Sequence, residues 1–225
     1  MKELMQSNGG VVSMMTGIIL ASGFSRRMGK EKLLLKVNGI PMIERVIMAA
    51  QSSHLDELII IYQRDEIREL AKEHVAKALY NQHADEGQSA AVKLGIQSSH
   101  PDTEGFMFLV GDQPYLDPST INKLIALFKR DRTSIVVPLY NGAMGNPVIF
   151  PATAKKDLLL LKGDCGGRRL IEQMRDIVKL VEIEKSIVGM HIDTEEEYKN
   201  IQELKEGGKI EIGKAGLKQD RYDYA

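Results

Sequence analysis

A loop near the start of the chain, Gly23 to Lys32, combines residue types that bind phosphate groups. It follows an apolar run and holds two glycines, a serine and four cationic side chains within ten positions. Glycines let backbone N–H groups approach anionic oxygens closely. Arg27 offers a planar fork of donors, and Lys32 offers a compact positive charge. The composition of this loop therefore predicts a site for a triphosphate.

Two common glycine-rich loops do not account for this spacing. The dinucleotide-binding pattern G-x-G-x-x-G requires a middle glycine, but five other residues separate Gly23 from Gly29. The strand expected at 58–61 also runs into Tyr62 instead of the acidic residue that binds ribose. A Walker loop requires four residues between its glycines and then Lys-Ser or Lys-Thr, whereas Lys30 precedes a glutamate. The loop is therefore of a third kind.

A carboxylate follows another apolar run, Phe106 to Val110, which ends in Gly111 and Asp112. The carboxyl ends of parallel strands share one edge of a sheet, so we expect Asp112 on the same edge as the glycine loop. Mg²⁺ prefers one or two carboxylates together with substrate phosphates and waters. Asp112 is therefore a candidate metal ligand. The alternative, that it only caps the turn before Asp117, stays open at this point.

The residues around the glycine loop resemble a known signature. In order they read Leu20-Ala21-Ser22-Gly23-x-Ser25-x-Arg27-Met28-Gly29-x-x-Lys32-Leu33-Leu34. This pattern is similar to that of the nucleotidyltransferases that load a nucleotide onto molybdenum cofactor, and more broadly of nucleoside-triphosphate transferases. The resemblance implies catalytic roles for Arg27, Lys32 and Asp112. It implies nucleotide binding by Leu20, Ala21, Ser22, Gly23, Ser25, Arg27, Gly29, Lys32, Gly87 and Ser89. For the last two, placed beside the base, a plain helix start is the alternative.

The second half of the chain resembles the acceptor side of the same family. Segment 145–150 is similar to the pattern G-x-P-V-x-F, and segment 161–168 is similar to L-x-G-D-x-G-x-R. These matches imply acceptor binding by Asn146, Asp164 and Arg168. The common family member carries histidine where this chain has Asn146, so a role in shaping the turn before the following proline is equally open.

The segment that begins at Asp193 resembles the family's closing motif D-T-P-E-D-L, with Glu195 in place of the proline. The resemblance implies that Asp193 is a second metal carboxylate beside Asp112. Independently of metal, Thr194 and Glu197 have the spacing of a capping box at a helix start. The five histidines of the chain lack the spacing of a zinc site.

The implied reaction is a Mg²⁺-dependent transfer of CMP from CTP to the terminal phosphate of a molybdopterin-type cofactor, with release of pyrophosphate. CTP is expected because guanylyl-transferring members of the family carry glycine at the position of Ser22, whereas cytidylyl-transferring members carry a small side chain. The alternatives are guanylyl transfer to the same cofactor, cytidylyl transfer to a sugar or polyol phosphate, and a non-catalytic nucleotide-binding accessory protein for a molybdenum hydroxylase. A transient contact with such a hydroxylase or its chaperone is compatible with the resemblance.

The whole chain excludes several other classes of function. Its 225 residues carry a formal net charge of -1, with a pI near 6.5, so no basic field attracts nucleic acid or an anionic membrane. A single cysteine, Cys165, excludes an intrachain disulfide and fits a reducing compartment. No apolar run reaches the roughly 20 residues of a membrane span, and residues 1–16 do not resemble a secretory signal. We therefore expect a cytoplasmic protein.

The elements that must position these residues alternate along the chain. Strands are expected at 58–62, 78–81, 134–140 and 178–183, and helices at 65–76, 118–130 and 168–175. This βαβ alternation indicates an α/β protein. The resemblance implies a three-layer Rossmann-like nucleotidyltransferase fold, with a mostly parallel central sheet and helices on both faces. We expect an N-terminal extension at 1–15, the nucleotidyltransferase domain at 16–206 and a C-terminal tail at 207–225.

Overall fold

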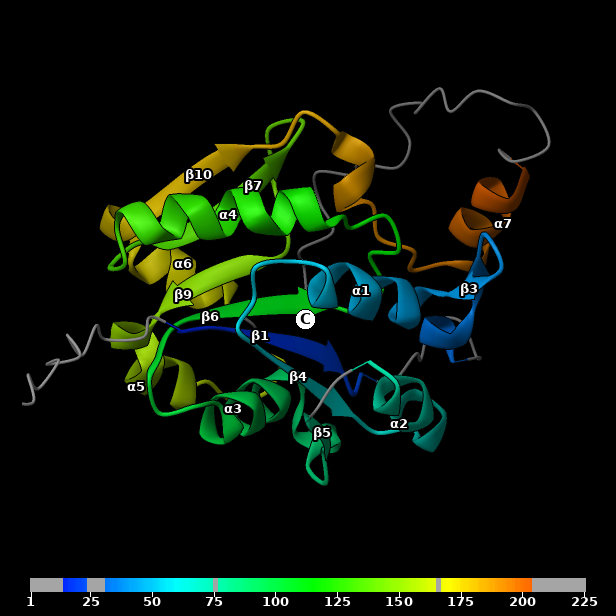
Figure 1. Cartoon of the computed structure of the whole chain (residues 1–225), viewed down its shortest axis with the longest axis horizontal. Helices are drawn as coiled ribbons and strands as arrows, with labels where there is room; N and C mark the ends of the chain where they lie inside the picture. Colours follow the sequence, from blue (N-terminus) through cyan, green and yellow to red (C-terminus); the bar gives the residue numbers. More distant parts are fainter. Residues whose placement is uncertain (1–13, 24–30, 75–76, 165–166, 204–225) are drawn as a thin grey trace, which may run out of the picture.

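The strands of the protein gather into one main sheet (Figure 1). The computed structural model describes residues 14–23, 31–74, 77–164 and 167–203. Its strands are β1 (Met14–Ala21), β2 (Lys36–Val37), β3 (Ile40–Pro41), β4 (Glu57–Tyr62), β5 (Lys77–Tyr80), β6 (Thr103–Val110), β7 (Ile135–Tyr140), β8 (Ala143–Met144), β9 (Val148–Pro151) and β10 (Val178–Glu182). The main sheet has the order β10-β7-β9-β6-β1-β4-β5, with β8 beside β7.

Most neighbours in this sheet are parallel. Strand β1 lies between β4 and β6 and is parallel to both, β5 is parallel to β4, and β10 is parallel to β7. Two strands are exceptions: β9 runs antiparallel to both β6 and β7, and β8 runs antiparallel to β7. The parallel arrangement brings the ends of β1 and β6 to one edge, where Leu20 pairs with Val110. The segments that hold the predicted residues Ser22 and Asp112 begin at this edge.

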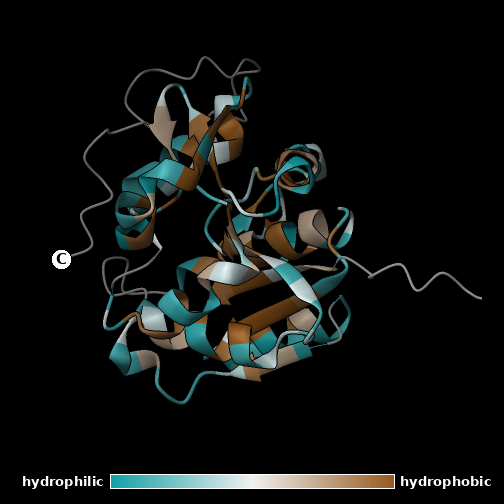
Figure 2. Ribbon diagram, turned by 90° about the vertical axis from the view of Figure 1, so that its left-hand side faces the viewer, coloured by the Kyte–Doolittle hydropathy of each residue, from teal (hydrophilic) through white to brown (hydrophobic). Residues whose placement is uncertain are grey.

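Helices cover both faces of the sheet. They are α1 (Met42–Gln51), α2 (Asp65–Lys72), α3 (Gln88–Ser98), α4 (Pro118–Arg130), α5 (Lys155–Leu159), α6 (Arg168–Gln173) and α7 (Glu195–Glu203). Apolar residues of α1, α2 and α4 pack on one face, and those of α3, α5 and α6 pack on the other. Successive strand residues point to opposite faces, so Ile18 and Ile19, both fully buried, belong to different cores. Figure 2 shows apolar strands, in brown, between the helices.

A third, smaller core joins the last described helix to the hairpin that follows the glycine loop. The β2–β3 hairpin and α7 enclose Val37, Met42, Ile192 and Ile201, all buried. The hydroxyl of Tyr198 on α7 also donates a hydrogen bond of 2.9 Å to the carbonyl of Lys36. Short 3-10 segments connect the larger elements: η1 (Lys32–Leu34), η2 (Ala84–Glu86), η3 (Ala152–Ala154), η4 (Arg175–Ile177) and η5 (Ser186–Gly189). Helix α7 is therefore fixed next to the residues that follow the glycine loop.

The predicted fold class is confirmed: the sheet is mostly parallel and helices cover both faces. Helix α4 has the expected bounds, with Asp117 capping it through the N–H of Thr120 at 2.7 Å. Strand β1 begins at Met14, so the expected domain start at residue 16 falls inside this strand. Helix α2 ends at Lys72, earlier than expected. Among the described helices, none is both long and apolar enough to cross a bilayer.

Candidate active site

Asp112 and Lys32 meet at the carboxyl edge of the sheet. Asp112 follows β6, whose residues are mostly buried, and its side chain is only 12% exposed. Lys32 begins η1, which is held to the core by the buried side chain of Leu33. The Lys32 ammonium donates to Oδ2 of Asp112 at 2.6 Å. The carboxylate thus takes part in a partly buried charged contact, while Asp117, not Asp112, caps α4.

Asp193 joins this pair from the segment that leads into α7, the last described helix. Its Oδ1 accepts a hydrogen bond of 2.8 Å from the same Lys32 nitrogen. The preceding residue, Ile192, is fully buried and donates its backbone N–H to the carbonyl of Asp112 at 3.3 Å. The two carboxylates, separated by 81 positions in the sequence, therefore share one cation.

The predicted capping box is confirmed at the start of α7. The Thr194 hydroxyl accepts from the N–H of Glu197 at 3.2 Å. The Glu197 carboxylate in turn accepts from the N–H of Thr194 at 3.0 Å and from that of Asp193 at 2.9 Å. These reciprocal bonds satisfy backbone donors at the helix start. They also fix the backbone that carries the Asp193 carboxylate.

The charges at this site stabilise one another. Burial by itself lowers the pKa of the Lys32 ammonium, but the charges and hydrogen bonds of Asp112 and Asp193 outweigh it and raise that pKa. Burial by itself raises the pKa of the Asp112 carboxyl, but Lys32 and His191 outweigh it and hold that pKa well below its usual range. Lys32 is therefore cationic and Asp112 anionic near neutral pH.

These residues fit a magnesium ion. Two carboxylate oxygens converge on one point, which is now occupied by the Lys32 nitrogen, and Mg²⁺ prefers one or two carboxylates completed by substrate phosphates and waters. Within the described ranges no group of three or more histidine, cysteine, aspartate or glutamate side chains forms a protein-only metal site. The donor set therefore suits a cation that arrives with a phosphate substrate better than a permanently held one.

Two residues that sequence reasoning missed surround the Asp112 carboxylate. His191 Nδ1 lies 3.1 Å from Asp112 Oδ1, and His191 Nε2 lies 3.2 Å from the side-chain nitrogen of Gln113. Burial by itself lowers the pKa of His191, but the charge and hydrogen bond of Asp112 outweigh it and raise that pKa. The sequence held one hint, because Gln113 directly follows the candidate ligand Asp112. Nothing distinguished His191 from four other scattered histidines.

On the nucleotide side, Ser22 is held by another missed residue, Asn81. The Asn81 side chain, 2% exposed at the end of β5, donates to the Ser22 hydroxyl at 2.9 Å. Its oxygen accepts from the N–H of His83 at 3.1 Å. Asn81 therefore links the loops that follow β1 and β5. Leu20 and Ala21 end β1, and Gly23 follows Ser22; the other predicted loop contacts, Ser25, Arg27 and Gly29, lie outside the described residues.

The start of α3 is in close contact with the segment that precedes α6. Gly87 has φ +88, and a Cβ there would lie 2.5 Å from an Asp164 oxygen, so only glycine fits without strain. The N–H of Ser89 donates to the carbonyl of Gly163 at 3.1 Å, and the N–H of Gln88 donates to Asp164 at 3.3 Å. The Ser89 side chain itself is buried. Asp164, expected at the acceptor, thus also supports the helix expected beside the base.

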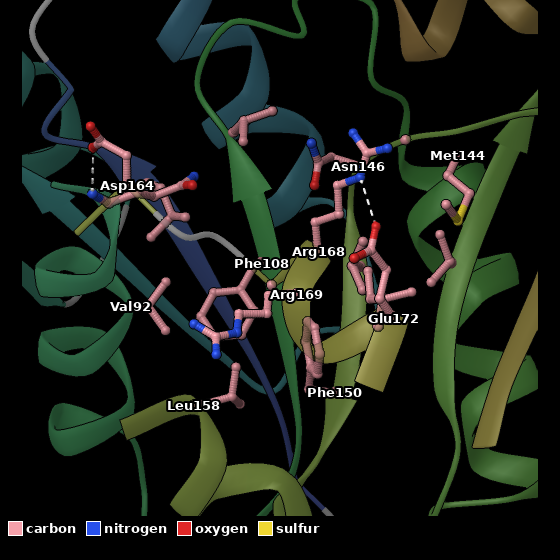
Figure 3. A pocket seen from close by; sticks show the side chains of 18 of the residues that line it. Val92, Phe108, Met144, Asn146, Phe150, Leu158, Asp164, Arg168, Arg169 and Glu172 are labelled. Carbon is pink, nitrogen blue, oxygen red and sulfur yellow. Dashed lines mark hydrogen bonds and ion pairs between the residues drawn. The ribbon is translucent and has the colours of Figure 1, made fainter. Parts of the chain in front are cut away.

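A pocket of about 370 Å³ opens next to these loops (Figure 3). Its interior is apolar, and Phe108 and Phe150 meet there edge to face with ring centroids 5.9 Å apart. The three predicted acceptor residues, Asn146, Asp164 and Arg168, all line it, together with Arg169, which sequence reasoning did not select. Arg168 forms an ion pair with Glu172 at 3.4 Å, drawn as a dashed line in Figure 3.

The pocket reaches the nucleotide side of the sheet edge, because Leu20 and Gln88 also line it. The structure therefore brings the predicted acceptor residues together around a cavity that borders the predicted nucleotide loops. An apolar cavity with cationic groups suits a ligand that has a ring system and an anionic end.

Comparison with known proteins agrees with this geometry. The model of the family described as MobA-like NTP transferase domain matches residues 17–178. Purine catabolism protein PucB from Bacillus subtilis (strain 168) is 30% identical over 198 residues, which cover 81% of this chain and 93% of that protein. A probable molybdenum cofactor guanylyltransferase from Natranaerobius thermophilus is 30% identical over 129 residues, 56% of this chain and 61% of its own length.

Among solved structures, Rv0371c from Mycobacterium tuberculosis H37Rv superposes with a TM-score of 0.72 at 25% identity, covering 85% of this chain and 98% of that chain. A structure described as a complex of Rv0371C with manganese has a TM-score of 0.71 at 24% identity, covering 85% and 99%. The second likeness shows a shared fold.

Proposed function

The chain belongs to the MobA-like NTP transferase domain family and is a nucleotidyltransferase, and on that premise we propose that it transfers CMP from CTP to the terminal phosphate of molybdenum cofactor. The observation that carries the reaction type is the convergence of Lys32, Asp112 and Asp193 at the carboxyl edge of the sheet. Relatives named for molybdenum cofactor support the choice of acceptor.

In the proposed reaction, an oxygen of the acceptor phosphate attacks the α-phosphorus of the nucleotide. A new P–O–P linkage forms, the bond between the α-phosphorus and the bridging oxygen breaks, and pyrophosphate leaves with that oxygen. Both reactants are anions, so charge neutralisation and positioning carry the catalysis and no protein nucleophile is needed. A bound Mg²⁺ supplies positive charge at the reacting phosphates.

Each side chain at the site has a separate proposed role. Asp112 and Asp193 would hold the cation, and Lys32, no longer between them, would place its ammonium against the α-phosphate, where negative charge develops. Electrostatic stabilisation of this kind is worth about 3 kcal/mol in the transition state. Arg27, in the glycine loop, is proposed to hold the β- and γ-phosphates. The close contacts of Lys32 with both carboxylates support this division, because the lysine is already within reach of the metal position.

The acceptor is proposed to bind in the pocket of Figure 3. Its ring system would contact Phe108 and Phe150, and its phosphate would pair with Arg168 and Arg169, both exposed. The polar side of the pocket includes Asn146 and supports an acceptor that has both a ring system and an anion. Transient delivery of the product to a molybdenum hydroxylase or its chaperone is part of this proposal.

CTP is proposed over GTP because Ser22 provides a side chain where guanylyl-transferring members have glycine. The Asn81 hydrogen bond holds that side chain in a buried position, 6% exposed, which supports a fixed volume beside the base. The names of the guanylyltransferase relatives favour GTP as the second candidate. The choice between CTP and GTP in this proposal therefore depends on Ser22.

The deciding experiment follows pyrophosphate release by the purified protein with Mg²⁺, each of the four NTPs in turn, and molybdopterin-type cofactor. We expect release with CTP that depends on the cofactor and is lost in Asp112→Asn. Release with GTP instead would overturn the nucleotide assignment only. Release with a sugar or polyol phosphate, but not with the cofactor, would overturn the acceptor. Nucleotide binding without any release would identify a non-catalytic binding protein.

A further inference from the structure

The side chain of Gln113 is fully buried directly after Asp112, and its nitrogen lies close to three polar atoms. Nε2 lies 3.3 Å from the carbonyl oxygen of Asn146, 3.3 Å from that of Gly189 and 3.2 Å from Nε2 of His191. The other end of the amide, Oε1, is buried without a hydrogen-bond partner in the described parts of the chain. Buried side-chain oxygens usually accept a hydrogen bond, whereas the polar contacts of this amide are all at its nitrogen, next to His191.

The two backbone carbonyls determine which way the amide points. A carbonyl oxygen only accepts hydrogen bonds, so the end of the amide that faces Asn146 and Gly189 must be the donor end. Turning the amide over would place Oε1 against both carbonyls and lose both bonds. The Asn146 carbonyl is itself fixed, because the Tyr140 hydroxyl donates to it at 2.7 Å. The donor end of Gln113 is therefore held toward His191.

The orientation of Gln113 in turn places the hydrogen on the His191 ring. The amide nitrogen has only two hydrogens, and it donates but does not accept, so a hydrogen on Nε2 of His191 would face another donor at 3.2 Å. A neutral ring therefore carries its hydrogen on Nδ1. Nδ1 faces Oδ1 of Asp112 at 3.1 Å. A protonated ring also carries a hydrogen on Nδ1. Asp112 therefore receives an N–H from His191 in either protonation state.

The two oxygens of Asp112 consequently have different partners. Oδ1 accepts from His191, whereas Oδ2 accepts from Lys32 on the side that Asp193 also faces. A carboxylate with one oxygen held by a buried donor cannot rotate that oxygen into the metal position. Neighbouring hydrogen bonds of this kind commonly orient metal ligands in proteins.

We propose that His191 and Gln113 are positioning residues for the metal carboxylate: Gln113 keeps the hydrogen of His191 on Nδ1, and His191 holds Oδ1 of Asp112 so that Oδ2 faces the cation. The inference rests on the proposed role of Asp112 in holding the metal. It adds that the acceptor side is connected to the metal side, since one amide contacts both the Asn146 backbone and His191.

The first test uses the protein without metal or nucleotide. Nitrogen-15 NMR of the histidine rings reports which nitrogen carries the hydrogen, and His191 is assigned by comparison with the His191→Asn variant. We expect the Nδ1–H form when the ring is neutral. A neutral His191 with its hydrogen on Nε2 would overturn the inference whatever the reaction of the protein.

The second test compares two substitutions of similar polarity. The amide nitrogen of Asn lies about as far from the backbone as Nδ1 does, whereas that of Gln reaches about as far as Nε2. His191→Asn therefore preserves a donor to Asp112, and His191→Gln does not. Mn²⁺ binding, followed by electron paramagnetic resonance, should weaken roughly 10- to 100-fold in His191→Gln and much less in His191→Asn. Thermal unfolding shows whether both variants are folded.

Equal losses of Mn²⁺ affinity in the two variants would overturn the positioning role, because the ring would then matter only for packing. Failure of the unsubstituted protein to bind Mn²⁺ would overturn both the metal site of the proposed function and the role of His191 toward it. In that case the NMR result still decides where the ring hydrogen lies. If the unsubstituted protein binds Mn²⁺ and carries the hydrogen of His191 on Nδ1 but does not turn over CTP, only the proposed substrates would be contradicted.

Discussion

Lys32 is 19% exposed and lies between two carboxylates, whereas Arg168, at the acceptor pocket, is 49% exposed and pairs with an equally exposed Glu172. The first set of charges is held by partly buried hydrogen bonds between several segments, and the second projects from one short helix. Reaction centres gain from charges that are fixed before the substrate arrives, while exposed ion pairs contribute little to stability. Substitutions at the two regions should therefore change different measurable quantities.

The largest effect is expected for Asp112→Asn, which removes a charge from the reaction centre. Turnover should fall about 10³-fold, as when a preorganised electrostatic group is lost, while nucleotide affinity measured by calorimetry changes far less. Asp117→Asn is the matched control, because Asn also caps helices well and Asp117 caps α4 away from the site. Near-normal turnover in Asp112→Asn would remove the distinction between the two regions.

Lys32→Met should weaken the folded state when no metal is present. It leaves two neighbouring carboxylates without their shared cation, and breaking a buried charge pair costs about 3 kcal/mol. Urea denaturation measures this loss, and Mg²⁺ should restore part of it by binding between Asp112 and Asp193. Turnover should stay low even with Mg²⁺. An unchanged unfolding midpoint without metal would show that the buried contact is not a fixed feature of the protein.

Arg168→Ala should affect the acceptor and leave the fold intact. Loss of a charge-assisted hydrogen bond to phosphate should raise the KM for the acceptor about tenfold, with kcat little changed, which is the signature of lost ground-state binding. Arg175→Ala provides the control, since Arg175 is also exposed but does not line the pocket. A fall in kcat at unchanged KM would instead place Arg168 with the reaction centre.

The smallest effect is expected at Ser22. Ser22→Gly removes volume beside the proposed base site and should lower the ratio of kcat/KM for CTP to that for GTP about fivefold, in the range of small steric changes in binding pockets. Ser22→Ala keeps a side chain but loses the Asn81 hydrogen bond, so it should retain the preference for CTP. Competition between the two nucleotides measures the ratio. Identical ratios in all three proteins would show that the base is selected elsewhere.

Sequence reasoning predicted the parts of the molecule that depend on local pattern. The apolar spacing and Asp-Pro start of α4, the capping box at Thr194 and the strand that leads to Asp112 all follow from neighbouring residues. The same reasoning brought Lys32, Asp112 and Asp193 into one hypothesis because their motifs resemble a family. Each of these features has a signal within a few positions of the sequence.

The contacts that sequence reasoning missed have no such local signal. His191 meets Asp112 across 79 positions, and Asn81 meets Ser22 across 59. The sequence alone does not show whether the side chain of a histidine or asparagine is solvated or hydrogen-bonded to a residue far away in the chain. Strand β1 also extends further toward the N-terminus than expected, because Met15 is fully buried in the main core and pairs with Gly105 of β6.

The candidate site depends on Asp193, which lies just before α7 near the end of the described chain. The region matched by the family model stops at residue 178, yet Asp193 lies fifteen positions beyond it and reaches Lys32 across 161 positions. A fragment cut at the family boundary would keep every strand of the main sheet except the remainder of β10, and it would lose one of the two carboxylates. During synthesis, too, the proposed site is completed only when residues 193–203 have been made and α7 has docked against the hairpin. The region that the family model matches is thus shorter than the unit that the proposed reaction requires.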